Sequence, residues 1–222
     1  MGIALNFESV LAYWPDLLGG ALLTLRLSLM AMLIGLAIAI PCAWARADGP
    51  VAVKRLIGVY VEAVRNTPLL IQIYIVFFGL PGLGLRLSAD NAALLALALN
   101  VGAYSTEIIR AGIQSIDRGQ IEAGRALGLR GAQIFRHVII RPAVRNIYPA
   151  LTSQFIILML FSSLVSAISA NDLSSVANHV QSVTFRSFEV YILVTAIYFA
   201  LSSGMSAFFA LIYRRFIHYP TR

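Results

Sequence analysis

The sequence predicts an all-α integral membrane protein with five transmembrane helices, an external N-terminus and a cytoplasmic C-terminus. Apolar residues make up 59% of the 222 residues, charged residues only 12%, and the mean hydropathy is +0.81, far above that of a soluble domain. Five apolar runs are each long enough to cross a bilayer, and most basic residues fall on one side of them.

The apolar runs define the spans, because a helix needs about 20 mostly apolar residues to cross the hydrocarbon core. Arg26 lies in the first run and is costly in lipid, so we expect the embedded part to begin near Leu27 and residues 1–19 to form a short interfacial helix. The first eighteen residues contain no Lys or Arg, unlike a cleavable signal peptide. The expected spans are 20–44, 57–79, 91–110, 147–169 and 190–213.

The basic residues predict the orientation, because Lys and Arg are retained on the cytoplasmic side. With the N-terminus outside, thirteen of the 17 basic residues are cytoplasmic, two are external, and Arg26 and Arg65 lie within or at the ends of spans. The external pair is Arg86 and Arg186. The cytoplasmic set is Arg46, Lys54, Arg55, Arg110, Arg118, Arg125, Arg130, Arg136, Arg141, Arg145, Arg214, Arg215 and Arg222.

Several kinds of site are excluded by composition. The single cysteine, Cys42, cannot form an intramolecular disulfide, and the three histidines share no metal-ligand spacing. The net charge of +7 follows from cytoplasmic arginines, so it does not require a nucleic-acid partner. The only lysine, Lys54, is not part of a phosphate-binding Gly-x-x-x-x-Gly-Lys motif. We therefore expect no metal, no bound cofactor and no ATPase activity in this chain.

The longest cytoplasmic segment, residues 111–146, has helical character. Good helix formers run from Gln120 to Leu127, and Gly128 is suited to the position just after a helix end. A second helix is expected to start within 132–138, and Pro142 suits a first turn or a kink at the start of the fourth span. The segment therefore predicts a short helix on the membrane surface, available to a cytoplasmic partner.

This segment resembles the permease subunits of type I ATP-binding cassette (ABC) importers, in particular the polar amino acid uptake family. The family pattern is Glu-Ala-Ala, three residues, Gly, nine residues, then Ile-x-Leu-Pro. The chain has Glu122-Ala123-Gly124, then Gly128, then Val138-Ile139-Ile140-Arg141, with a proline one place late at Pro142. The spacing of the first half is kept.

The resemblance covers about residues 19–214. Arg65-Asn66-Thr67-Pro68-Leu69-Leu70-Ile71-Gln72 is similar to the start of the family's second span, and Thr184-Phe185-Arg186-Ser187-Phe188-Glu189 to the start of its fifth. Residues 78–81 and 104–113 are similar to the ends of the second and third spans. The chain departs from the family at Leu160-Phe161-Ser162-Ser163, where many members have Lys-Asp-Thr-Ser. The expected organisation is an external or interfacial segment 1–18, a transmembrane domain 19–214 and a cytoplasmic tail 215–222.

The resemblance implies the type I ABC importer permease fold in the bacterial cytoplasmic (inner) membrane, and import of a polar amino acid. It implies three protein partners: an ATPase subunit dimer that binds ATP and Mg, a second permease chain, identical or homologous, and an external solute-binding protein. Glu122 would engage the ATPase through segment 120–135, with Gly124 and Gly128 permitting close approach. The expected coupling residues are Glu122, Ala123, Gly124, Arg125, Gly128 and Leu129.

A polar substrate also needs polar groups along its path, and each candidate could instead bond to a neighbouring helix. The candidates are Thr67, Gln72, Asn100, Tyr104, Ser162, Ser163 and Ser166. Two acid–base pairs three residues apart, Glu62 with Arg65 and Glu107 with Arg110, are either self-neutralising pairs or parts of a cytoplasmic gate.

Two further patterns concern packing and docking. Ala31, Gly35 and Ala39 recur at intervals of four, which predicts a helix face that approaches another helix closely, either within the subunit or in its permease partner. Residues 172–183 are expected to form an external surface helix on which the binding protein docks.

Two other classes remain open from the residues alone. A secondary transporter driven by an ion gradient usually carries acidic or histidine relays inside its spans, and the interiors of the expected spans lack acids. A non-transporting membrane scaffold would leave the 120–135 segment without an ATPase to bind. A membrane enzyme is disfavoured, since no nucleophile, base and orienting group recur at a helical spacing.

Overall fold

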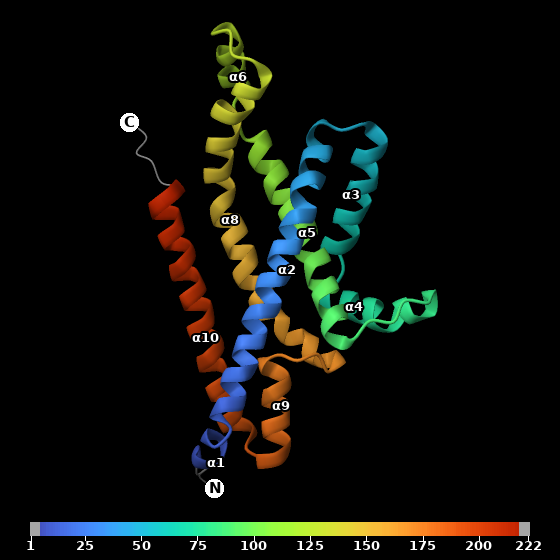
Figure 1. Ribbon diagram of the computed structural model, residues 1–222, viewed down its shortest axis with the longest axis vertical. Coiled ribbons are helices and arrows are strands. Elements are labelled where there is room, and N and C mark those ends of the chain that lie inside the picture. The colour runs from blue at the N-terminus through green and yellow to red at the C-terminus, as the bar shows by residue number, and fades with distance from the viewer. Residues whose placement is uncertain (1–4, 218–222) are drawn as a thin grey trace.

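The computed structural model describes residues 5–217, and within that range the chain is helical with no β-strand. Four helices are long and apolar enough to cross a membrane, and one bent helix pair brings the number to five if it counts as a span. The bundle is elongated, with α1 and α9 at one end and α6 at the other (Figure 1). Of the terminal segments 1–18 and 215–222, residues 1–4 and 218–222 lie outside the described residues.

The first span is a longer helix than the sequence predicted. After one short turn, α1 (Glu8–Leu11), the helix α2 (Trp14–Asp48) runs unbroken through Arg26 and is about 52 Å long at 1.5 Å per residue. Pro15 lies in its first turn, where a missing N–H costs nothing, and Asp16 favours the same end of the helix dipole. The expected separate helix over 1–19 is therefore reduced to α1, and Arg26 belongs to the span.

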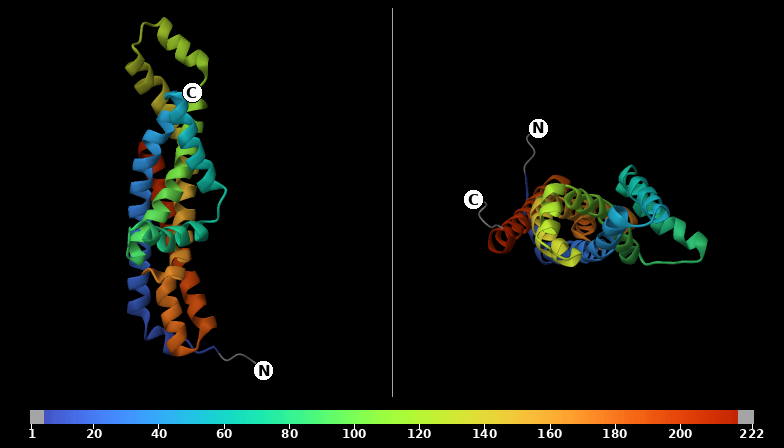
Figure 2. Two further views of the ribbon diagram at one scale, coloured as in Figure 1. Left: turned by 90° about the vertical axis from the view of Figure 1, so that its right-hand side faces the viewer. Right: turned by 90° about the horizontal axis from the view of Figure 1, so that it is seen from above.

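The expected second span, 57–79, is sharply bent. Two helical arms meet at an angle of 110° around residues 66–68. Pro68 has no N–H and disfavours a helical conformation at Thr67, which accounts for the break. Both arms project to one side of the bundle (Figure 2). The elements are α3 (Val51–Arg65), α4 (Leu69–Tyr74), a π-helical turn η1 (Ile75–Gly79) and a 3-10 turn η2 (Leu80–Leu83).

The third span, α5 (Ala89–Gln114), packs along α2 over much of its length. The predicted stripe of small residues lies in this contact, with Ala31 and Ala39 fully buried. At Gly35 an added Cβ would lie 2.2 Å from Val101 Cγ1 and 3.1 Å from the Ala98 carbonyl oxygen. The close helix approach predicted from the stripe is thus confirmed, and it occurs within the chain.

The fourth span starts earlier than the predicted 147–169. Helical structure is continuous over residues 131–168, and its π-helical part ends at Ile139, three residues before Pro142, which cannot donate to a regular helical ladder. The preceding surface helix is α6 (Arg118–Ala126). The span itself consists of α7 (Gly131–Gln133), the π-helical η3 (Ile134–Ile139), α8 (Ile140–Phe161) and the 3-10 segment η4 (Ser162–Ile168).

The expected external helix over 172–183 is α9 (Leu173–Thr184), whose first turn is capped by the Asp172 carboxylate, 2.8 Å from the Ser175 N–H. One face of α9 is buried through Ala177 and Val180, which join a cluster with residues of α2 and α10. This helix therefore lies alongside the first part of α2, and not beyond the ends of the spans. The last span is α10 (Ser187–Ile212), followed by the π-helical turn η5 (Tyr213–Ile217).

Candidate functional site

The surface helix α6 is closed at both ends by local interactions. Asp117 accepts a hydrogen bond from the Gly119 N–H at its start. At its end the Leu129 N–H donates to the Gly124 carbonyl and the Gly128 N–H to the Arg125 carbonyl, the paired bonds of a Schellman motif. Gly128 has a φ of 77°, in the left-handed region that glycine adopts without strain. The predicted helix stop at Gly128 is confirmed.

Most of the expected coupling residues are presented outward. Glu122, Ala123, Arg125 and Gly128 are exposed, Leu129 is half-buried, and α6 stands at the extreme end of the molecule (Figure 1). Gly124 is buried, because the α6 backbone rests there on the next segment of the chain. A Cβ at Gly124 would lie 3.4 Å from Ile134 Cγ1 and 3.6 Å from Val138 Cγ2. Within this chain, the close approach of Gly124 is therefore to η3.

Sequence reasoning missed Leu127 on the same segment. It is the residue directly after the last helical position of α6, and its side chain is 80% exposed. An exposed leucine next to an exposed carboxylate is a suitable contact for a protein partner. The sequence did contain a signal for Leu127, because it stands directly before Gly128, where the helix is expected to end.

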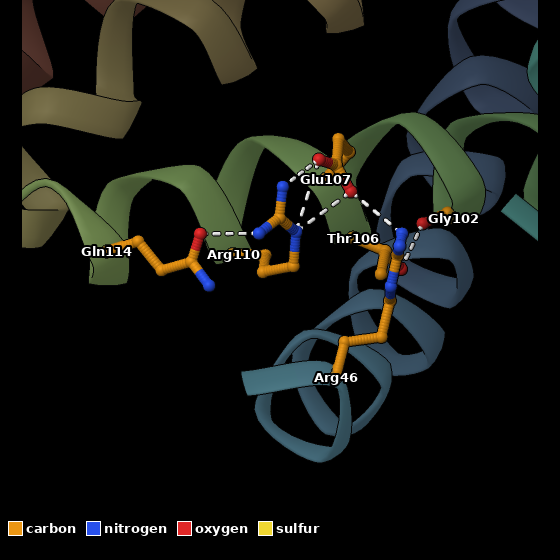
Figure 3. A network of polar contacts seen from close by, with 6 residues as sticks. All are labelled: Arg46, Gly102, Thr106, Glu107, Arg110 and Gln114. Atoms are coloured by element: carbon orange, nitrogen blue, oxygen red, sulfur yellow. Dashed lines mark hydrogen bonds and ion pairs between the residues drawn. The ribbon is translucent and has the colours of Figure 1, made fainter. Parts of the chain in front are cut away.

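A three-residue ionic network joins α2 to α5 (Figure 3). Arg110 donates from Nε to both Glu107 carboxylate oxygens at 3.1 Å, and its terminal nitrogens Nη1 and Nη2 donate to Gln114 and Glu107. Arg46 Nη1 lies 2.9 Å from Glu107 Oε2. The predicted Glu107–Arg110 pair is formed, and it gains Arg46, which is 61 residues away and which spacing did not indicate.

The second predicted pair, Glu62 with Arg65, is not formed among the residues that the structure describes. The Arg65 guanidinium instead lies over the Tyr104 ring, 5.4 Å from its centroid, as in a cation–π contact. Arg65 is the last residue of α3, so the break at Pro68 turns its side chain toward α5 and away from Glu62. The contact between Arg65 and Tyr104 of α5 therefore replaces the ion pair that Arg65 was expected to form with Glu62 on its own helix.

Four expected path residues meet at the break between α3 and α4. Gln72 Nε2 donates to the Val64 carbonyl at 2.7 Å and the Thr67 carbonyl at 3.0 Å, and Gln72 Oε1 accepts from Asn100 Nδ2 at 2.9 Å. The Tyr104 hydroxyl lies 3.5 Å from the Arg65 carbonyl oxygen. These bonds satisfy carbonyls that a broken helix leaves unpaired, which is necessary at membrane depth.

The three expected path serines all lie in η4. Each hydroxyl donates to the carbonyl three residues before it: Ser162 to Met159, Ser163 to Leu160 and Ser166 to Ser163, at 2.7 to 2.8 Å. Ser162 is fully buried, whereas Ser163 and Ser166 are half-buried and their oxygens keep the capacity to accept a hydrogen bond from a ligand. Within residues 5–217, no group of three or more His, Cys, Asp or Glu side chains is arranged to hold a metal ion.

Residues 31–218 match the family described as binding-protein-dependent transport system inner membrane component. The chain belongs to this family. It is 34% identical over 212 residues to the nopaline transport system permease protein NocM of Agrobacterium fabrum, covering 91% of this chain and 88% of that protein. It is 37% identical over 169 residues to the L-cystine transport system permease protein TcyB of Bacillus subtilis, covering 76% and 72% of the two chains.

The fold of this family member also matches a solved structure. A chain in the crystal structure of an amino acid ABC transporter with histidines superposes with a TM-score of 0.89 at 40% identity, covering 96% of this chain and 100% of that one. The bent second span and the protruding α6 therefore belong to a type I ABC permease fold.

Proposed function

We propose that this chain is the membrane permease subunit of an ATP-driven importer of polar amino acids, coupled to a cytoplasmic ATPase through α6. The observation that carries the coupling role is the outward presentation of Glu122 and Leu127 at the extreme end of a permease-family bundle. The relatives are named as transport permeases for nopaline and L-cystine, which supports an amino acid or amino acid derivative as cargo. Family membership does not favour a gradient-driven transporter or a scaffold.

The packing of α6 supplies a route for mechanical coupling. Buried Gly124 sits against Ile134 and Val138 of η3, and η3 continues without a break into α8. A displacement of α6 by the ATPase would therefore move α8 as one body, and α8 ends at the η4 turn that packs against α4 and α5. Rigid-body rocking of this kind alternates access without changing individual helices.

The positions of the loops support an orientation with α6 and the C-terminus in the cytoplasm. The α2–α3 turn with its basic residues, α6, and the end of α10 all point toward the same end of the bundle (Figure 1). Basic loops are retained in the cytoplasm. In a bacterial inner membrane, lipid would contact apolar side chains such as Leu33, Phe199 and Phe208, which are 67%, 72% and 58% exposed in the isolated chain.

The coupling role is tested with Glu122→Lys in the complete transporter reconstituted in liposomes. We expect uptake to fall by about tenfold or more while the spans stay folded, because the substitution reverses a charge at the ATPase contact. Glu8→Lys is the matched control, since Glu8 is also exposed but lies on α1, at the end of the bundle opposite α6 (Figure 1). Equal uptake by the two variants would refute coupling through Glu122.

The assembly is tested by mass spectrometry of the complex extracted gently from its membrane. We expect two ATPase chains for two permease chains, and the masses report whether the second permease is identical to this one. A chain that is recovered alone in several mild detergents would contradict the importer assignment.

A further inference from the structure

A polar pocket lies where α2, the start of α5 and the turn between η4 and α9 meet. It has a volume of about 290 Å³, at the lower end of the range for small-molecule sites. Its polar lining is Arg26, Ser88, Asp90, Asn91 and Asn171, and leucine and methionine side chains of α2 and α5 complete the wall. None of these residues belongs to the path candidates that the sequence indicated.

The pocket lies near the middle of the membrane. The apolar run of α10 between Glu189 and Arg214 comprises residues 190–213, about 36 Å of helix, which little exceeds a hydrocarbon core of about 30 Å. The Asn6 N–H donates to Glu189 Oε1 at 3.0 Å, which places the chain just before α1 beside the start of α10, and Leu17 lies in the first turn of α2 that follows. Arg26 is nine residues further along α2, about 14 Å deeper.

The other pocket residues lie at the same depth as Arg26. The Leu173 N–H donates to Thr24 Oγ1 at 3.0 Å, which places the start of α9 beside this turn of α2. Asn171 in turn contacts Asp90, through its backbone N–H at 2.8 Å and its side-chain amide at 3.0 Å. Asp90, which the expected span 91–110 placed at a membrane boundary, is therefore an acid at mid-depth.

The charges in the pocket are held apart. Arg26 and Asp90 line the same pocket, yet no ion pair joins them in the described part of the chain, and both side chains are exposed in the isolated chain. Asp90 is held by the neutral donors of Asn171. Charged groups at this depth are costly in lipid and face protein or a water-filled cavity. This face of α2 and α5 therefore lines the translocation path or a partner chain.

We propose that this pocket binds the zwitterionic head of the transported amino acid, with Arg26 contacting the α-carboxylate and Asp90 contacting the α-ammonium group. The proposal rests on the proposed function, and it assigns a binding site within it. A guanidinium and a carboxylate that face one pocket without pairing complement the two opposite charges shared by all α-amino acids. Asn171 is a positioning residue, because it fixes the Asp90 carboxylate.

The first arm of the test measures uptake of each standard ¹⁴C-labelled L-amino acid by the complete wild-type transporter in liposomes. The amino acid imported fastest is then used in tritiated form in a binding assay on the permease–ATPase complex. Its competitors are two analogues of the same amino acid, the amine that lacks the α-carboxylate and the acid that lacks the α-ammonium group.

The wild type should bind each analogue about tenfold or more weakly than the amino acid, since each analogue leaves one charge in the pocket unpaired. Arg26→Gln should remove the preference over the amine only, and Asp90→Asn the preference over the acid only. Arg86→Gln, which removes an exposed arginine outside the pocket, should retain both preferences. A general structural defect would not separate the two analogues in this way.

Retention of both preferences by both variants would overturn the proposal while leaving the importer assignment intact. Absence of uptake of every amino acid by the wild type would refute the proposed function and the site with it. If Arg26→Gln fails to assemble with its ATPase, Arg26→Lys decides: it keeps the charge without the planar fork, so its preference over the amine should be intermediate. An unchanged preference in Arg26→Lys would count against the carboxylate contact.

Discussion

Substitution of Gly35 by alanine should destabilise the chain because it forces α2 away from α5. The added methyl would lie 2.2 Å from Val101 Cγ1, about 1.3 Å short of a normal carbon–carbon contact. Rotation of Val101 does not relieve the whole clash, since the Ala98 carbonyl oxygen and the Gly102 nitrogen are both at 3.1 Å and belong to the α5 backbone. Overpacking of this kind costs about 1–3 kcal/mol.

Gly19→Ala is the matched control on the same helix. Nothing lies within 4 Å of a Cβ at Gly19, so this variant experiences only the change in helix propensity. That change favours alanine by about 1 kcal/mol at both positions and cancels in the comparison. The difference in the free energy of unfolding between the two variants should thus equal the overpacking cost, about 1–3 kcal/mol.

The assay is equilibrium unfolding of the purified chain by SDS in mixed micelles, followed by the fluorescence of Trp14 and Trp44, both of which lie on α2. Equal stability of Gly35→Ala and Gly19→Ala would mean that α2 and α5 are not in backbone contact at this position. The packing argument for the small-residue stripe would then fail.

Three other substitutions test the site in the same unfolding assay. Glu107→Gln should lower the free energy of unfolding by about 1–3 kcal/mol, because it leaves two partly buried guanidinium groups without their carboxylate. The control Glu62→Gln removes no ion pair in the described structure and should change this free energy by less than about 0.5 kcal/mol. Similar losses in both variants would refute the network. Gly124→Ala should raise the free energy of unfolding by about 0.5–1 kcal/mol, because its methyl makes ordinary contacts 3.4 to 3.7 Å away and alanine favours the helix. A lower free energy of unfolding would show that α6 packs more tightly on η3 than described. Gln72→Leu should lower the free energy of unfolding by about 1–3 kcal/mol, since it leaves carbonyls of the helix break unpaired and removes the acceptor of Asn100. An unchanged unfolding midpoint would mean that these bonds do not stabilise the fold and would leave Gln72 free for the substrate path.

Local patterns were sufficient for much of the architecture. Four of the five apolar runs correspond to helices long and apolar enough to cross a bilayer, because crossing requires a minimum length of apolar helix, whereas the second run forms a helix pair bent by 110°. Gly128 predicted the end of α6 correctly, because glycine adopts without strain the left-handed conformation that commonly follows a helix end. Glu107 and Arg110 were correctly paired because a helix brings residues three apart onto one face.

Local patterns did not predict the span boundaries or the partner of Arg65. Pro68 accounts for a break after Thr67, but the bend of 110° between the two arms depends on how both arms pack against other helices. Glu62 and Arg65 satisfy the same spacing rule as Glu107 and Arg110, yet Arg65 contacts Tyr104. A surface pair contributes little energy, so a competing contact between helices readily displaces it.

The sequence by itself determined the class of the protein, the positions of four long apolar helices and the helix that presents Glu122, because each of these depends on residues within a turn or a span of one another. Only the tertiary structure decided that Arg46 joins Glu107 across 61 residues, and that Asn171 meets Asp90 across 81. Such meetings follow from the packing of whole helices, which no short-range periodicity encodes. For the same reason, Arg26 was recognised in the sequence only as a costly charge, and its neighbours in the polar pocket became apparent once the helices were assembled.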